Sequence, residues 1–90
     1  MITKGKFRKK EDFSKESLMA YDNLTLDILK HFAEKCFASI SMTMRNFGID
    51  RERATKIVDK LEKIGFISEA DGSKAREVYI TLEDYKKLFE

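Results

Sequence analysis

The sequence contains no proline, only one cysteine and no long run of hydrophobic residues. Without proline, no segment has the composition of a proline-rich linker, and a length of 90 residues favours one domain. A single cysteine excludes a disulfide within the chain and favours a reducing, cytoplasmic setting. No apolar run approaches the roughly 18 residues that a spanning helix needs, so we expect no membrane segment. No apolar stretch follows the basic N-terminal region, so a secretory signal is not indicated.

The charge is unevenly distributed, although the net charge is only +2. Residues 1–15 carry six basic side chains against two acids, whereas residues 16–40 carry two lysines against four acids. We therefore predict a basic, flexible tail over residues 1–20 and one domain over residues 21–90. The tail either only solvates the chain or adds non-specific contacts to phosphates.

Two helices are predicted in the first half of the domain. Asp22 or Asn23 is a suitable cap for a helix that ends near Lys35. The short segment "FASIS" then suits a brief strand, and Ser41 caps a second helix over "MTMRNF" that stops at Gly48. The apolar face of the first helix is expected to comprise Leu24, Ile28, Leu29, Phe32, Ala33 and Cys36.

The segment "RERATKIVDKLEKI" has the strongest helical periodicity in the chain. Asp50 is a good N-cap, and Gly65 is a clear C-terminal stop. Its apolar stripe consists of Ala54, Ile57, Val58, Leu61 and Ile64. Its opposite face consists of Arg51, Glu52, Thr55, Lys56, Asp59, Lys60 and Lys63.

A β-hairpin and a short last helix complete the prediction. "FISEA" and "REVYIT" alternate in polarity around the turn "DGSK", and "LEDYKKLF" forms one or two helical turns. We expect this last helix to pack back through Leu82, Tyr85, Leu88 and Phe89. Two helices joined by "NFGIDR" and followed by a hairpin predict an α+β fold, a winged helix-turn-helix with three helices, a short strand and a β-hairpin wing.

Nothing in the sequence indicates an enzyme, a cofactor or a metal site. There is no phosphate-binding glycine loop, and His31 has no cysteine or acidic pair at ligand spacing. We expect His31 at the surface or at its boundary rather than as a ligand. Cys36 is expected as a core thiol, with a reactive thiol as the alternative. The acids are scattered over helix faces, where solvated charge is the ordinary interpretation.

Basic residues at the start of the third helix point to DNA. Arg51, Arg53 and Lys56 occupy its first two turns, where helix-turn-helix proteins contact base edges, and Lys60 follows on the same face. Basic side chains gain no stabilisation from the helix dipole at a helix N-terminus, so their position there needs another explanation. The alternative is a solvated face on which Asp50 and Glu52 pair with the arginines.

The hairpin has the same two interpretations. Ser73, Lys74 and Arg76 lie at or beside its turn, where they would contact phosphates. The alternative is a hairpin tip that charge keeps soluble.

Several motifs together resemble one family, the C-terminal γ domain of FtsK/SpoIIIE-type DNA translocases. They are "ASIS" (38–41), Arg53–Ala54, Leu61–Glu62, "DGSK" (71–74) and "REV" (76–78), within a match from Tyr21 to Thr81. The resemblance implies a winged helix that binds short, G-rich, oriented double-stranded DNA sequences and steers the motor in chromosome segregation. It also implies that several copies can bind side by side on one DNA site, although we expect a monomer in solution. It further implies contact with a site-specific recombinase.

The resemblance also implies roles for particular residues. The base-reading positions of the family fall on Glu52, Arg53 and Lys56. Arg53 matches the family pattern, and Lys56 keeps the charge but lacks the bidentate fork of arginine. Glu52 departs from the pattern, since a carboxylate cannot donate to guanine but can accept from cytosine. In the wing, Ala75 replaces the usual proline, so less rigidity is expected.

Two questions stay open from the sequence. The winged helix could instead dock a protein, such as a recombinase or a motor subunit, or act as a small transcriptional regulator. The dense basic start "KGKFRKKEDF" favours a stand-alone relative without the motor over an excised fragment.

Overall fold

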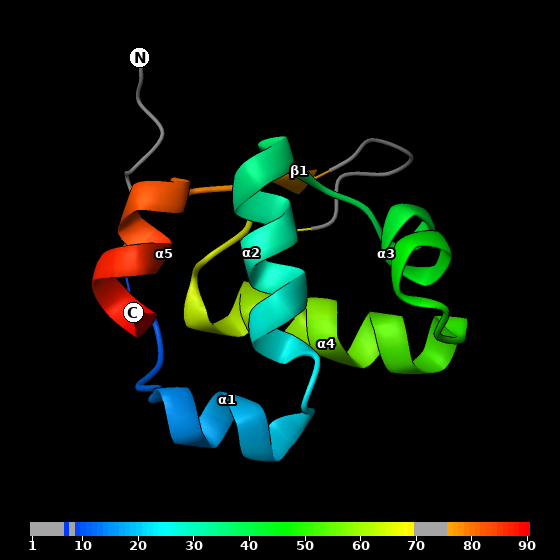
Figure 1. Cartoon of the computed structure of the whole chain (residues 1–90), viewed down its shortest axis with the longest axis horizontal. Coiled ribbons are helices and arrows are strands. Elements are labelled where there is room, and N and C mark those ends of the chain that lie inside the picture. The colour runs from blue at the N-terminus through cyan, green and yellow to red at the C-terminus, as the bar shows by residue number, and fades with distance from the viewer. Residues whose placement is uncertain (1–6, 8, 70–75) are drawn as a thin grey trace.

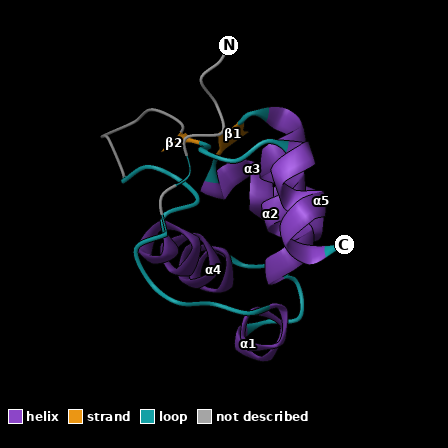
Figure 2. Cartoon of the chain, turned by 90° about the vertical axis from the view of Figure 1, so that its left-hand side faces the viewer, coloured by secondary structure: helices purple, strands orange, loops and turns teal. Residues whose placement is uncertain are grey.

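Helix α2 (Thr25–Lys35) lies at the centre of the molecule, and the other elements are arranged around it (Figure 1). The computed structural model describes residues 7, 9–69 and 76–90. Figure 2 shows helix α1 beneath helix α4, with the two strands at the opposite end of the molecule. The remaining elements are α1 (Lys15–Tyr21), β1 (Phe37–Ala38), α3 (Ile40–Phe47), α4 (Arg51–Ile64), β2 (Arg76–Glu77) and α5 (Leu82–Phe89).

The helix-turn-helix unit consists of α3 and α4, and local sequence fixes its ends. Gly48 ends α3 in the left-handed conformation, with φ at 64°. The Asp50 side chain caps α4 by accepting a hydrogen bond from the Arg53 backbone N–H, and Gly65 ends this helix. These three predictions are confirmed. The cap of α3 is Ser39, whose side chain accepts from the Met42 N–H, so the prediction of Ser41 was wrong.

The core lies where α2 and α4 turn their apolar faces inward. The predicted stripe of α4 is completely buried, which confirms the periodicity argument. On α2 the prediction was wrong for Cys36, which is exposed. Cys36 has φ at 67°, so the chain leaves the helical path there and its side chain leaves the apolar face. The buried residues of α2 are Thr25, Leu26, Ile28, Leu29, Phe32 and Ala33.

The extended segments join the chain before α3 to the chain after α4. Strand β1 pairs antiparallel with β2, with Phe37 opposite Glu77 and Ala38 opposite Arg76. On the other side of this strand, Ile67 forms an antiparallel bridge with Val78. The two arms of the predicted hairpin therefore lie side by side, while its turn, "DGSK", falls outside the described residues. The arrangement is the predicted α+β winged helix-turn-helix.

The segment before residue 21 differs from the prediction of a flexible tail. Its described part includes helix α1, which begins with a capping box between Ser14 and Ser17, and Leu18 of this helix is fully buried. Phe13 lies edge-on to Phe66 of the core, with ring centroids 5.1 Å apart. Residues 9–21 thus form part of the packed structure.

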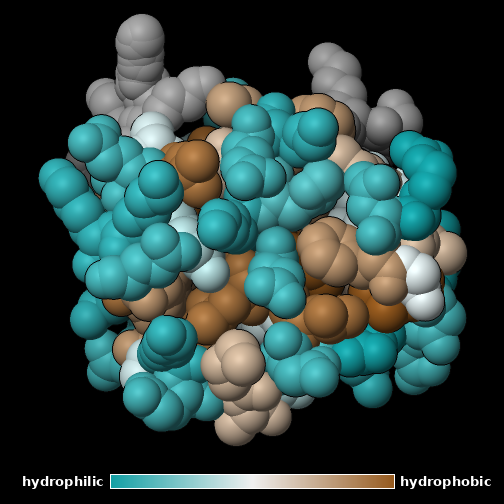
Figure 3. All heavy atoms as spheres, in the orientation of Figure 1, coloured by the Kyte–Doolittle hydropathy of each residue, from teal (hydrophilic) through white to brown (hydrophobic). Residues whose placement is uncertain are grey.

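Helix α5 packs back onto the fold, as the sequence predicted, and the structure places it against α2. Tyr85 and Phe89 are buried, and Leu82 is partly buried beside them. Leu88 was expected in this contact, but 43% of it is exposed, because a helix turns about 100° per residue and Leu88 lies on a different face from Phe89. Figure 3 shows polar side chains over most of the surface in this view, with hydrophobic residues gathered in a band across the middle.

Candidate nucleic-acid interface

The face of α4 opposite the core is exposed along its length. Four charged residues at helical spacing share this outward face, and all four are exposed. Glu52 and Lys56 are four residues apart, with the ammonium 3.7 Å from a carboxylate oxygen. The face carries two acids and two bases, so its own charges balance. Its residues are Glu52, Lys56, Asp59 and Lys63.

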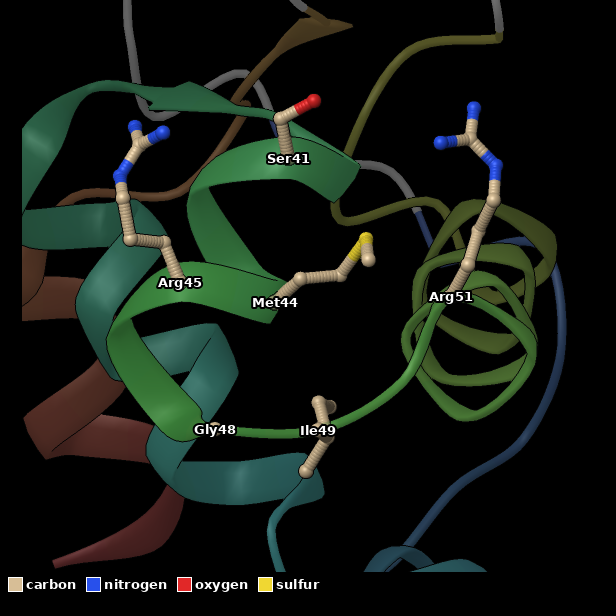
Figure 4. Close-up of a pocket in the computed structure, with 6 residues that line it drawn as sticks. All are labelled: Ser41, Met44, Arg45, Gly48, Ile49 and Arg51. Carbon is tan, nitrogen blue, oxygen red and sulfur yellow. The ribbon is translucent and has the colours of Figure 1, made fainter.

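An open hollow of about 470 Å³ lies between α3 and the start of α4. Arg45 of α3 and Arg51 of α4 stand on its two sides, and both guanidinium groups extend in the same direction (Figure 4). Ser41 lies between the two arginines and points the same way, whereas the Met44 side chain extends sideways from α3 toward Arg51. The lining residues are Ser41, Met44, Arg45, Gly48, Ile49 and Arg51.

The two arginines of the hollow keep their charges exposed. Both residues are exposed, and none of the ion pairs among the described residues involves either of them. Arg51 was predicted as a helper in DNA contact. Arg45 was not singled out from the sequence, because the helix dipole already explains a basic residue in the last turn of a helix.

Arg53 lies on another flank of α4 and is held by the junction between α1 and α2. Its Nε and Nη2 donate to the two carboxylate oxygens of Asp22, each at 2.8 Å, and Nη2 also donates to the side-chain oxygen of Asn23 at 3.0 Å. These hydrogen bonds from Arg53 hold the pKa of Asp22 below its usual value. The same hydrogen bonds raise the pKa of Arg53. The predicted base reader is thus engaged within the domain.

Lys60 lies on the same flank as Arg53. Its ammonium is 3.7 Å from a carboxylate oxygen of Glu11 and 5.5 Å from the centroid of the Tyr21 ring. The Tyr21 hydroxyl donates to the backbone carbonyl of Lys56 at 3.1 Å. The Lys56 side chain itself remains 67% exposed on the outward face. The two lysines predicted to contact DNA therefore have different surroundings.

Among the predicted contacts that the structure describes, Arg76 is the most enclosed. Only 11% of its side chain is exposed, and its Nη1 donates to Oε1 of Glu62 at 2.7 Å. Its Nη2 lies 3.9 Å from a carboxylate oxygen of Asp59. These contacts connect strand β2 to α4. Ser73 and Lys74, the other predicted wing residues, lie outside the described residues.

The described residues add three further findings. They contain no group of three or more His, Cys, Asp and Glu side chains that could hold a metal ion. His31 lies at the boundary, as predicted, with its Nε2 3.2 Å from Nδ2 of Asn46. Among the helices described, none is long and apolar enough to cross a bilayer.

The helix pair α3–α4 followed by two antiparallel arms defines a winged helix-turn-helix domain. Residues 19–81 match the family model of the FtsK gamma domain, and the chain belongs to this family. The resemblance stated from the motifs is thereby confirmed.

Three relatives illustrate the match. The chain is 41% identical over 68 residues to the DNA translocase SftA of Bacillus subtilis (strain 168), which covers 76% of the chain and 7% of that protein. It is 38% identical over 69 residues to the DNA translocase FtsK of Caldanaerobacter subterraneus subsp. tengcongensis, covering 77% of the chain and 10% of that protein. For the DNA translocase SpoIIIE of Bacillus subtilis, the identity is 41% over 51 residues, covering 57% of the chain and 6% of that protein. The chain thus spans a tenth or less of the length of these relatives.

Proposed function

We propose that this domain binds double-stranded DNA, with α4 in the major groove. The observation that carries the proposal is the outward face of α4, which is exposed over the whole helix beside a hollow lined by two arginines. An α-helix fits the width of the major groove, and the second helix of a helix-turn-helix unit enters it. Membership of the FtsK gamma domain family supports DNA binding as well.

The proposal assigns different roles to the predicted site residues. Glu52 and Lys56 face the bases, and Arg51 contacts the DNA beside them. Arg53, Lys60 and Arg76 are engaged by Asp22, Glu11 and Glu62 respectively, so we assign them to holding α4 in place. Two residues of the wing, Ser73 and Lys74, remain proposed phosphate contacts.

Glu52 sets the expected sequence preference. A carboxylate accepts a hydrogen bond from the exocyclic amine of cytosine, whereas it would face the acceptors of guanine without a proton to donate. We therefore propose an oriented target that departs from a G-rich motif at the base pair that Glu52 faces. The neighbouring Lys56 can donate to guanine, but as a single point of charge rather than a fork.

Selection of bound sequences from a random duplex pool tests the function directly. The selected duplex is then titrated at low and moderate salt by fluorescence anisotropy, with binding expected to weaken steeply as salt rises. The variant Glu52→Gln should lose about 1–3 kcal/mol of discrimination at one base pair. Glu83→Gln, the same change at an exposed position of α5, is the matched control. Absence of salt-dependent binding to any duplex would contradict the proposal.

A second candidate function is docking of a protein. The balanced charges of the outward face favour it, because Glu52 and Asp59 would repel phosphates that Lys56 and Lys63 attract. The partner would be a motor subunit or a recombinase. This alternative predicts that the chain shows no salt-sensitive affinity for duplex DNA.

We further propose that the domain works with a translocase motor. All three relatives named above are DNA translocases, and the chain matches only a small part of each. A domain that binds an oriented sequence would give such a motor its direction on DNA.

A further inference from the structure

We propose that the hollow between α3 and α4 holds the sugar–phosphate backbone of one DNA strand, with Arg45 and Arg51 each contacting a phosphate. The inference rests on the proposed DNA binding and deepens it, because it adds residues of α3 to the interface. It assigns Met44 and Ile49 to contact with deoxyribose and the Ser41 hydroxyl to a phosphate oxygen. The first helix of a helix-turn-helix unit crosses the DNA backbone, which is consistent with a contact made from α3.

The shape and chemistry of the hollow fit a backbone better than a base. A DNA strand alternates a charged phosphate with a largely apolar sugar. The hollow places cations at its two sides and the apolar side chains of Met44 and Ile49 between them (Figure 4). It is open rather than enclosed, so a continuous strand can pass through it.

The surroundings of the four described arginines give a second, independent argument. Arg53 and Arg76 each have a carboxylate within hydrogen-bond distance. Among the described residues, no ion pair involves Arg45 or Arg51, although the chain is rich in acids. Two guanidinium groups that face one hollow without a counter-charge create a positive potential there, and a phosphate would be attracted to it.

The position of Arg51 strengthens this argument. It is the first residue of α4, where the positive end of the helix dipole disfavours a cation. Neither the dipole nor an ion pair among the described residues therefore explains an arginine at this place. Arg51 is also adjacent in sequence to Glu52, so the hollow borders the outward face that we propose enters the groove.

The salt dependence of DNA binding tests the inference. The full 90-residue chain and its Arg45→Ala and Arg51→Ala variants are titrated with the selected duplex and with an unrelated duplex over a range of salt concentrations. Each variant should reduce the slope of log K against log salt by about one, and the double variant by about two. The loss of affinity should be similar on both duplexes, because a phosphate contact carries no base sequence.

Matched variants separate charge from folding. Arg45→Lys and Arg51→Lys keep the cation and should restore the slope. Lys87→Ala, which removes an exposed cation of α5, should leave the slope unchanged. Circular dichroism of each variant confirms that the helices are retained.

A second measurement locates the contacts on the DNA. Single methylphosphonate linkages, which remove the charge of one phosphate, are placed in turn along the selected duplex. A linkage at one position should weaken DNA binding by the wild-type protein but not weaken binding by Arg45→Ala any further. A linkage at a second position should weaken binding by the wild type but not weaken binding by Arg51→Ala any further. Unchanged slopes in both variants, or a loss confined to one base pair, would overturn the assignment of the hollow. Failure of the wild-type chain to bind any duplex would overturn the proposed function itself.

Discussion

Helix α4 has two flanks that carry an arginine, and these flanks differ in what surrounds the guanidinium group. On one flank, Arg53 is fixed by Asp22 and Asn23 at the junction between α1 and α2. On the other flank, Arg51 borders an open hollow that it shares with Arg45. The two arginines are only two positions apart in sequence. The comparison teaches that the location of carboxylates, rather than the number of cations, separates arginines that are engaged within the fold from arginines that stay exposed without an ion pair among the described residues.

The largest expected effect is on stability, and it comes from weakening the packing of α1, whose junction with α2 holds Arg53. Leu18 is the buried residue of α1, so Leu18→Ala should cost about 2–5 kcal/mol in the free energy of unfolding. The measurement is urea unfolding followed by circular dichroism. Met19, which is 43% exposed on the same helix, provides the control, and Met19→Ala should have little effect. Similar small losses for both variants would show that α1 contributes little to holding this flank.

A smaller effect is expected at Arg76, the arginine held by Glu62. Arg76→Ala removes a hydrogen bond between charged groups and leaves the partly buried Glu62 without this partner, so it should cost about 2 kcal/mol in the free energy of unfolding. The salt slope of DNA binding should stay unchanged, because the side chain is directed to α4 rather than to solvent. Lys63→Ala, at an exposed position of α4, is the control for stability. If the salt slope fell by one while the free energy of unfolding stayed constant, Arg76 would be a phosphate contact, as proposed for Arg51, and not a contact that holds the fold.

The smallest expected effect is a pH dependence from Asp22. Its pKa is lowered in the folded chain, so its hydrogen bonds with Arg53 stabilise the fold above the unfolded pKa. This contribution is lost as the pH falls through the folded pKa, which lies below the usual 3.8. Asp22→Asn should therefore be less stable than the wild type at neutral pH, and the difference should shrink in acid. Thermal unfolding between neutral pH and pH of about 3 measures it.

The control for this pH dependence is Asp12, whose side chain is 98% exposed. Asp12→Asn should behave like the wild type across the same range. A difference between wild type and Asp22→Asn that stays constant into acid would mean that the pair with Arg53 does not stabilise the fold.

The parts of the fold that local sequence determines could be predicted from it. The periodic stripe of α4, its Asp50 cap and the glycines that end α3 and α4 depend on residues close together in the chain. Helix α1 was missed because Leu18 is its only buried residue, so the segment has no apolar stripe, and the basic residues before it suggest a tail. Cys36 was placed in the core because the helical spacing was continued one residue too far.

The candidate site was less predictable, because its decisive contacts join distant residues. The partner of Arg53 is 31 positions away, and the partner of Arg76 is 14 positions away. Spacing within one helix identifies which cations share a face, but it does not reveal an acid that another element brings to them. For the same reason the sequence did not unite Arg45 with Arg51, which come from different helices and line one hollow only in the folded structure.

The pairing of β1 with β2 has a consequence for the order in which the chain folds. Ala38 and Arg76 meet across a loop that contains the whole of α3 and α4. Closing a long loop is entropically costly in an unordered chain, and contacts between distant residues form slowly. Once the two helices have packed, the ends of this loop are already brought near each other. The stem of the wing would then assemble last, and its two short strands would form only on molecules whose helix-turn-helix unit is already in place.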